Sequence, residues 1–182
     1  MKSHDKNVHA EAEKIPTLED LKRISAIVEE IRIAMMTAVD ESGNLRSRPM
    51  YTQHMNLDDG VIWFFASIDS TKTGEIQKCG IVNLAYSHPE KNTYLSISGD
   101  AVLSRDQAKI KELWNPAAKA WFPEGTKDPK LCLIRVNVEH AEYWDAPSST
   151  MVTIFAAAKA IFTGRRPSGL GDHKGLDYTA RG

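Results

Sequence analysis

Short apolar segments alternate with clusters of turn residues along most of this chain, and a chain of that kind folds into antiparallel strands. The turns at 40–44 (DESGN) and 56–60 (NLDDG) carry the Asn, Asp and Gly residues that favour hairpins. No regular alternation of strand and helix appears, so we expect an α+β fold built on an antiparallel β-barrel. Strands are predicted over residues 33–39, 45–55, 61–66, 82–86, 93–98, 101–104, 131–138 and 140–144.

Helices are predicted as insertions between these strands. Thr17 and Asp20 form a capping-box pattern, and apolar residues then recur at helical spacing. Gly80 stands in the usual position after a short helix, and Asp106 resembles a helix cap. The predicted helices cover residues 17–31, 71–79, 106–114 and 149–162.

The length of 182 residues suits a single domain. We place this domain at 17–163. The polar segment 1–16 is predicted to be a flexible tail, and the Gly- and Arg-containing segment 164–182 a loose one.

Charge and cysteine content exclude several classes of function. The 23 basic and 24 acidic side chains create no basic field, so we expect neither a nucleic-acid nor a membrane partner. Cys79 and Cys132 stand far apart, and His54, His88 and His140 are isolated, so no metal site is predicted. The polar N-terminus lacks the apolar core of a signal peptide, which predicts a cytoplasmic protein.

Two segments could together bind an anion. Arg46 and Arg48 share one face of a predicted strand, where two guanidinium groups could hold one phosphate. Ser70, Thr71 and Lys72 begin a predicted helix, whose free N–H groups and dipole favour an anion. The alternative is that the arginines form the solvated face of a hairpin and Ser70 is an ordinary helix cap.

Several motifs occur in an order that resembles a known family. SRPM (47–50), WFFAS (63–67) and DSTK (69–72) are similar to motifs of the pyridoxamine 5′-phosphate oxidase-like FMN-binding family. The resemblance is closest to its bacterial general stress protein branch. It continues through YLSISGDA, IKELWNPAAKAWFPEG, DPKLCLIRV and AEYWDAP.

This resemblance implies a split β-barrel that forms a homodimer, with FMN in clefts at the subunit interface. Arg48 and Lys72 would then bind the flavin phosphate, with Ser70 and Thr71 beside them. Trp144 would pack against the cofactor of the partner subunit, although a core position is the alternative for a strand tryptophan. The residues that would line the flavin are Pro49, Met50, Phe65, Ala66 and Ser67.

The resemblance implies an FMN-dependent oxidoreductase for an unknown small molecule, and no catalytic side chain is assigned because the flavin carries the chemistry. The true oxidases follow their EFW segment with an arginine and a histidine, whereas Asp145 follows Trp144 here. We therefore expect no efficient oxidation of pyridoxamine phosphate. The alternatives are a non-catalytic flavin-binding or flavin-sensing protein, and a related barrel that binds heme or a deazaflavin.

Overall fold

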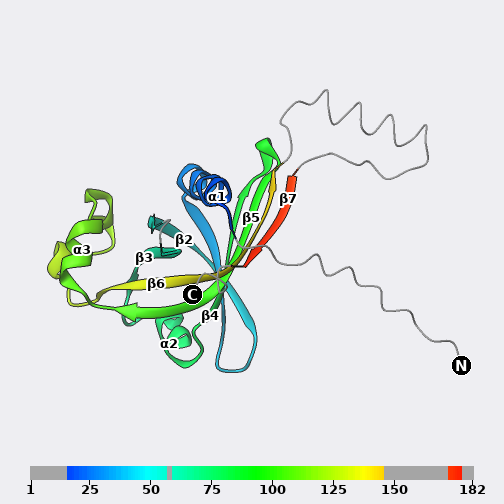
Figure 1. The fold of residues 1–182 in the computed structure, drawn as a ribbon. Helices are drawn as coiled ribbons and strands as arrows, with labels where there is room; N and C mark the ends of the chain where they lie inside the picture. The colour runs from blue at the N-terminus through cyan, green and yellow to red at the C-terminus, as the bar shows by residue number, and fades with distance from the viewer. Residues whose placement is uncertain (1–15, 57–58, 146–171, 178–182) are drawn as a thin grey trace, which may run out of the picture.

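Antiparallel strands dominate the chain in the computed structural model, which describes residues 16–56, 59–145 and 172–177 (Figure 1). The elements in chain order, with η for 3-10 turns, are α1 (Leu18–Ile31), β1 (Ile33–Val39), β2 (Leu45–Asn56), β3 (Val61–Ser67), α2 (Thr71–Lys78), β4 (Ile81–His88), η1 (Pro89–Lys91), β5 (Thr93–Ser104), α3 (Gln107–Leu113), η2 (Pro116–Ala120), η3 (Gly125–Lys127), β6 (Leu131–Asp145) and β7 (Asp172–Asp177).

The strands close into a barrel. Neighbouring strands pair in the order β3-β2-β1-β4-β5-β6, and β3 also pairs with β6. This last pairing joins the two ends of the sheet, with Val61 opposite Asn137 and Ser67 opposite Leu131. A closed sheet leaves fewer unpaired backbone groups at its edges. The predicted α+β antiparallel split barrel is therefore confirmed.

β5 and β6 are each one long strand where the sequence pattern predicts two. They stay paired across a register shift between Ser98 and Gly99. A Cβ atom at Gly99 would lie 2.0 Å from the carbonyl oxygen of Asn137, so only glycine fits there. Because β6 is long, its first half pairs with β3 and its second half is free to pair with β7.

α1 supplies one side of the barrel core. The capping box is present: Thr17 Oγ1 accepts from the Asp20 backbone, and the Thr17 backbone donates to Asp20 Oδ2 at 2.9 Å. The helix buries Leu21, Ile24, Ile27 and Val28. Each aliphatic side chain removed from water contributes about 1.5–3 kcal/mol. This packing, more than helix propensity, keeps α1 in place.

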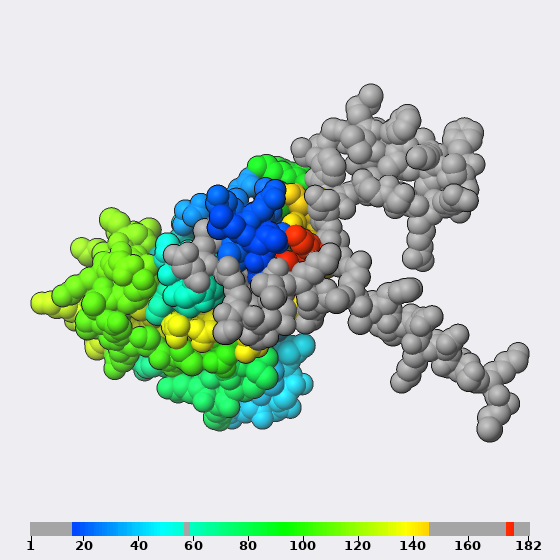
Figure 2. Space-filling view, in the orientation of Figure 1, coloured from blue at the N-terminus to red at the C-terminus, as the bar shows by residue number. Residues whose placement is uncertain are grey.

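A smaller lobe stands at one end of the barrel and contains α3, η2 and η3 (Figures 1 and 2). Its own apolar cluster consists of Ile110, Phe122, Leu131 and Leu133, which are all buried. The last two belong to β6, so the lobe packs onto a barrel strand. Trp63, Phe65, Leu113 and Trp114 cover this cluster and are partly buried.

β7 comes from the segment 164–182, which is predicted from its composition to be loose. Its six residues instead pair with β6, and Leu176 is fully buried in the barrel core. Lys174 donates to both carboxylate oxygens of Asp20 at 2.7 and 2.8 Å, which ties β7 to α1. The expected tail at 1–16, apart from the buried Pro16, and the expected helix at 149–162 lie outside the described residues. None of the described helices is long and apolar enough to cross a membrane.

Gly80 follows α2 as expected, but for a different reason. Its φ is not positive, so it is not the left-handed residue that commonly ends a helix. A Cβ atom there would lie 3.0 Å from the carbonyl oxygen of Ala101 on β5, and 2.3 Å from the carboxylate of Asp100, which would have to move. The glycine therefore allows β4 and β5 to begin pairing close to the end of the helix.

Candidate functional site

A cavity of about 590 Å³ lies between the barrel and the lobe. A volume of this size suits a small organic ligand, and its mainly apolar lining is typical of such sites. The lining residues are Ile33, Pro49, Met50, Tyr51, Gln53, Phe65, Ala66, Ser67, Lys72, Asn115, Ala117, Ala118, Trp121 and Phe122. The structure thus brings together six of the predicted site residues, namely Pro49, Met50, Phe65, Ala66, Ser67 and Lys72.

Strand alternation explains part of the barrel side of this cavity, because the lining also includes the core residues Met50 and Ala66. β2 and β3 are neighbours in the sheet, and alternate side chains of each strand point away from the barrel core. Phe65 is one of these outward side chains. Its ring lies 5.8 Å from the ring of Trp114 and 6.4 Å from that of Phe122, measured between centroids. These contacts hold the lobe against the barrel and shape the apolar wall.

Lys72 provides a positive charge at this cavity. It is the second residue of α2 and is half-buried. No acidic side chain in the described part of the chain forms an ion pair with it. Burial lowers the pKa of Lys72 below its ordinary value, and the positive charge of Arg48 lowers it further. An anion at this point would relieve both effects.

Arg48 lies close to Lys72 but binds a carboxylate. Its Nη1 and Nη2 donate to Oε2 and Oε1 of Glu75 at 2.6 and 2.7 Å. Glu75 is buried, with 4% of its side chain exposed. Arg46 instead pairs with Asp40 in the hairpin turn, at 3.0 Å. The two guanidinium groups therefore bind different carboxylates, and the expected joint grip on one anion is not present.

Ser70 and Thr71 are near Lys72 in sequence but do not line the cavity. Ser70 occupies the N-cap position of α2, yet its side chain makes no capping hydrogen bond. Its hydroxyl lies 3.2 Å from Thr73 Oγ1. Thr71 is exposed. Both hydroxyls lie at the start of the helix that carries Lys72, and their predicted role beside a phosphate stays a prediction.

Trp144 lies far from the cavity of its own chain. It belongs to the end of β6 that pairs with β5 and β7, whereas the cavity adjoins the strand β3 that pairs with the beginning of β6. Its exposed fraction is 38%, so it is not a core residue. The prediction that Trp144 reaches a cofactor held by a partner subunit is not tested by a single chain.

Sequence reasoning missed the polar side chains of the cavity. Asn115 Nδ2 donates to Gln53 Oε1 at 2.7 Å, which links the lobe to β2. Strand alternation after Pro49 could have pointed to Tyr51 and Gln53. Trp121 is 75% exposed although it lines the cavity, whereas the neighbouring Phe122 is buried.

A second depression, near α1, β6 and β7, is polar and open. Two ion pairs occupy it, Asp20 with Lys174 and Arg23 with Asp145. The charges in each pair neutralise one another, so we interpret the depression as a surface network of ion pairs and not as a binding site. No group of His, Cys, Asp and Glu side chains among the described residues could hold a metal ion.

Known proteins share this fold and part of this sequence. A general stress FMN/FAD binding protein from Xanthomonas citri is 32% identical, with a TM-score of 0.63, over 73% of this chain and 93% of that one. A protein from Clostridium acetobutylicum related to general stress protein 26 of B. subtilis is 19% identical, with a TM-score of 0.63. The match covers 70% of this chain and 89% of that one. Protein bli-3 of Neurospora crassa is 24% identical over 161 residues, which cover 84% of this chain and 77% of bli-3.

The family match covers most of the chain. The sequence profile described as "Pyridoxamine 5′-phosphate oxidase like" matches residues 19–168. That range includes the barrel strands β1–β6, the lobe, and every residue that lines the cavity. The chain therefore belongs to the pyridoxamine 5′-phosphate oxidase-like family.

Proposed function

We propose that this protein binds FMN in the cavity between barrel and lobe, with the flavin ring on the apolar wall and the phosphate at Lys72. The observation that carries the proposal is a half-buried lysine without an acidic partner in the described chain, at a mainly apolar cavity. A buried cation without a counter-ion is costly, and a phosphate would offset that cost. The similarity to the FMN/FAD binding protein of Xanthomonas citri supports a flavin as the ligand.

Arg48 adds to this anion site in a secondary way. Glu75 uses one N–H of Nη1 and one of Nη2, and a guanidinium has five N–H donors. Arg48 does not itself line the cavity, so its remaining donors, including that of Nε, would bind a phosphate oxygen only where the ligand extends past Lys72. The residues of this chain therefore fit FMN, with Lys72 as the main phosphate ligand.

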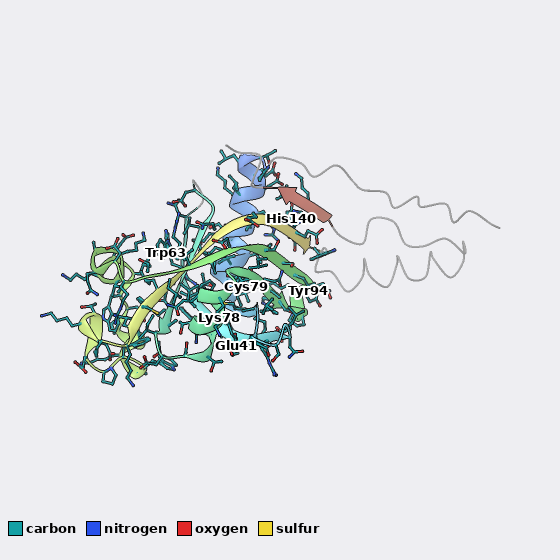
Figure 3. The ribbon with its side chains drawn as sticks, turned by 90° about the horizontal axis from the view of Figure 1, so that it is seen from below. Glu41, Trp63, Lys78, Cys79, Tyr94 and His140 are labelled. Carbon is teal, nitrogen blue, oxygen red and sulfur yellow. The ribbon has the colours of Figure 1, made fainter. Side chains whose placement is uncertain are left out.

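Absorbance spectroscopy tests the cofactor and the phosphate ligand together. The protein is mixed with FMN, desalted, and its visible spectrum recorded for wild type, Lys72→Ala and Lys78→Ala. Lys78 is the matched control because it lies on the same helix but pairs with Glu41 at the surface (Figure 3). Wild type and Lys78→Ala should retain flavin bands, and Lys72→Ala should lose them. If both variants retain flavin equally, Lys72 does not bind the phosphate. A heme or deazaflavin spectrum would show that the cofactor is not FMN.

We also propose that the bound flavin makes the protein an oxidoreductase for a small molecule in the cytoplasm, where Cys79 and Cys132 stay free thiols. FMN would supply hydride and electron transfer, while Ser67, Gln53 and Asn115 offer hydrogen bonds to ring or substrate. Loss of the flavin bands on addition of NADH or NADPH, and their return with an electron acceptor, would support catalysis.

A non-catalytic flavin-binding or flavin-sensing role is the second candidate. Of the described residues that line the cavity, only Lys72 and Tyr51 carry ionisable side chains, and none is a His, Asp, Glu or Cys. Flavin that stays oxidised with both nicotinamide donors, across many acceptors, would favour this role. We expect no efficient turnover of pyridoxamine phosphate in either case, and rapid hydrogen peroxide formation from that substrate would contradict this.

We further propose a homodimer that covers the outer face of β1 and β2. Ile33, Met35 and Tyr51 are 53%, 42% and 53% exposed there, and Ile33 lies opposite Tyr51 in the sheet. Ile33 and Tyr51 also line the cavity, so a second copy on this face would help to enclose the flavin. Light scattering should give about twice the chain mass of 20.3 kDa, and Met35→Lys should give the monomer.

A further inference from the structure

The pairing of Arg48 with a buried carboxylate changes the charge of the anion site. Lys72 and Arg48 contribute two positive charges, and Glu75 removes one. A phosphate monoester carries about −1.5 to −2 charges at pH 7. The site therefore leaves the bound phosphate incompletely neutralised, although the same two cations without Glu75 would match it.

From this we infer that Glu75 sets the affinity of the site for the flavin phosphate and keeps the flavin exchangeable. The inference rests on the proposed function. Glu75 lies three residues after Lys72 on α2, and side chains at this spacing share one face of a helix. Its carboxylate nevertheless binds Arg48 and leaves the ammonium group of Lys72 to the cavity.

Burial makes this charge effective. Glu75 has 4% of its side chain exposed and Arg48 has 28%. Solvent screens partly buried charges much less than exposed ones, so the carboxylate repels a phosphate that binds at the adjacent cations. Glu75 also competes with the phosphate for the guanidinium of Arg48. Both effects weaken the binding of FMN and leave the binding of riboflavin, which lacks the phosphate, unchanged.

The neighbouring ion pair on the same strand provides a matched control. Arg46 and Arg48 both belong to β2, and each binds one carboxylate. The pair of Arg46 with Asp40 is exposed in the hairpin turn, and neither residue lines the cavity. Asp40→Asn removes one negative charge, as Glu75→Gln does, but away from the proposed phosphate.

The test is to measure dissociation constants for FMN and for riboflavin in wild type, Glu75→Gln, Glu75→Met and Asp40→Asn, at low and high salt. Both Glu75 variants should bind FMN about tenfold more tightly, because one repulsive charge is lost near the phosphate. This gain should shrink at high salt, and riboflavin affinity should not change. Asp40→Asn should bind both ligands as wild type does.

The possible results separate the two proposals. If wild type binds FMN but the Glu75 variants bind it with equal or lower affinity, the inference is wrong and Glu75 merely positions Arg48. Glu75→Met separates the two roles clearly, because methionine makes no hydrogen bond to Arg48. If Glu75 only positions Arg48, this variant should bind FMN most weakly of all. If wild type binds neither flavin, the proposed function fails and the inference fails with it. Thermal melts identify any variant that does not fold, and the second Glu75 variant then decides.

Discussion

The two walls of the cavity are built in different ways. The barrel wall consists of strands that are hydrogen-bonded on both sides, over a core that includes the fully buried Phe64, Leu84 and Ile97. The lobe wall consists of the 3-10 turn η2 and the residues that flank it, in a lobe whose cluster has four buried residues, two of them from β6. Because local stability follows buried apolar contacts, the lobe should open at lower free energy than the barrel.

This difference suggests a division of labour. Lys72, and with it the proposed phosphate site, lies on α2, which follows β3 and packs Ile76 into the barrel core. The lobe wall carries Trp121 and Asn115, which face the other side of the cavity. Binding sites that must admit a ligand often use such less stable segments. We therefore expect the lobe to govern access to the cavity and the barrel to fix the position of the ligand.

Leu84→Ala in β4 should produce the largest effect, because it leaves a cavity in the barrel core. We expect the free energy of unfolding to fall by about 2–5 kcal/mol, measured by urea denaturation. The control is Ile81→Ala on the same strand, which is 67% exposed and should change stability by at most about 0.5 kcal/mol. A small effect at Leu84 would mean that the barrel is not the more stable wall.

Phe122→Ala in the lobe should have a smaller global effect. The side chain belongs to the small cluster and contacts Phe65. We expect a loss of about 1–2 kcal/mol because a segment that opens locally contributes less to global unfolding. Hydrogen exchange should show faster exchange at residues 107–122 and unchanged exchange in β4. Equal loss of protection in both regions would show that lobe and barrel unfold together.

Lys174→Met tests how β7 fastens the barrel. Burial of Asp20 raises its pKa, but hydrogen bonds from Lys174 and Thr17 outweigh burial and hold the pKa below the ordinary value of 3.8. Since the folded-state pKa is depressed, the stabilisation is present above the unfolded pKa and is lost as pH falls through the folded pKa.

Wild type should therefore be more stable than Lys174→Met by about 0.5–1 kcal/mol at pH 7. The difference should disappear as pH falls below 3.8. Lys22→Met, at an exposed position on α1, is the control and should match wild type. Thermal melts from pH 7 to pH 2.5 measure both variants. A difference that persists at the lowest pH would show that the ion pair is not its cause.

Trp121→Ala should have the smallest effect on stability, because the side chain is 75% exposed. Its loss should weaken FMN binding by about threefold, which corresponds to a modest aromatic contact. Lys119→Ala, at an exposed position of η2, should leave binding unchanged. Flavin fluorescence titration measures both. If Trp121→Ala binds FMN as tightly as wild type does, the lobe wall makes no contact with the flavin ring through Trp121.

Local patterns predicted much of this molecule. The capping box at Thr17, the hairpin turns and the alternation in β2 and β3 each depend on residues close together in the chain, so the sequence reveals them directly. The order of the motifs resembles that of a known family, and this resemblance predicted six residues that the structure brings together at the cavity. Local patterns also led to two errors. The pattern predicts a break in β5 after Ser98, because a glycine at a bulge resembles a turn, and a break in β6 at Glu139, the residue that the register shift leaves unpaired.

The sequence by itself determined the antiparallel barrel, the helix boundaries and the segment that carries Lys72, because periodicity and capping act over a few residues. Only the tertiary structure decided which charges pair and what encloses the cavity. Arg48 binds Glu75, 27 residues away, and Gln53 binds Asn115, 62 residues away. β7 returns to pair with β6 and buries Leu176. Such partners are chosen by packing across the whole chain, where any acidic or apolar residue could compete, so local sequence cannot specify them.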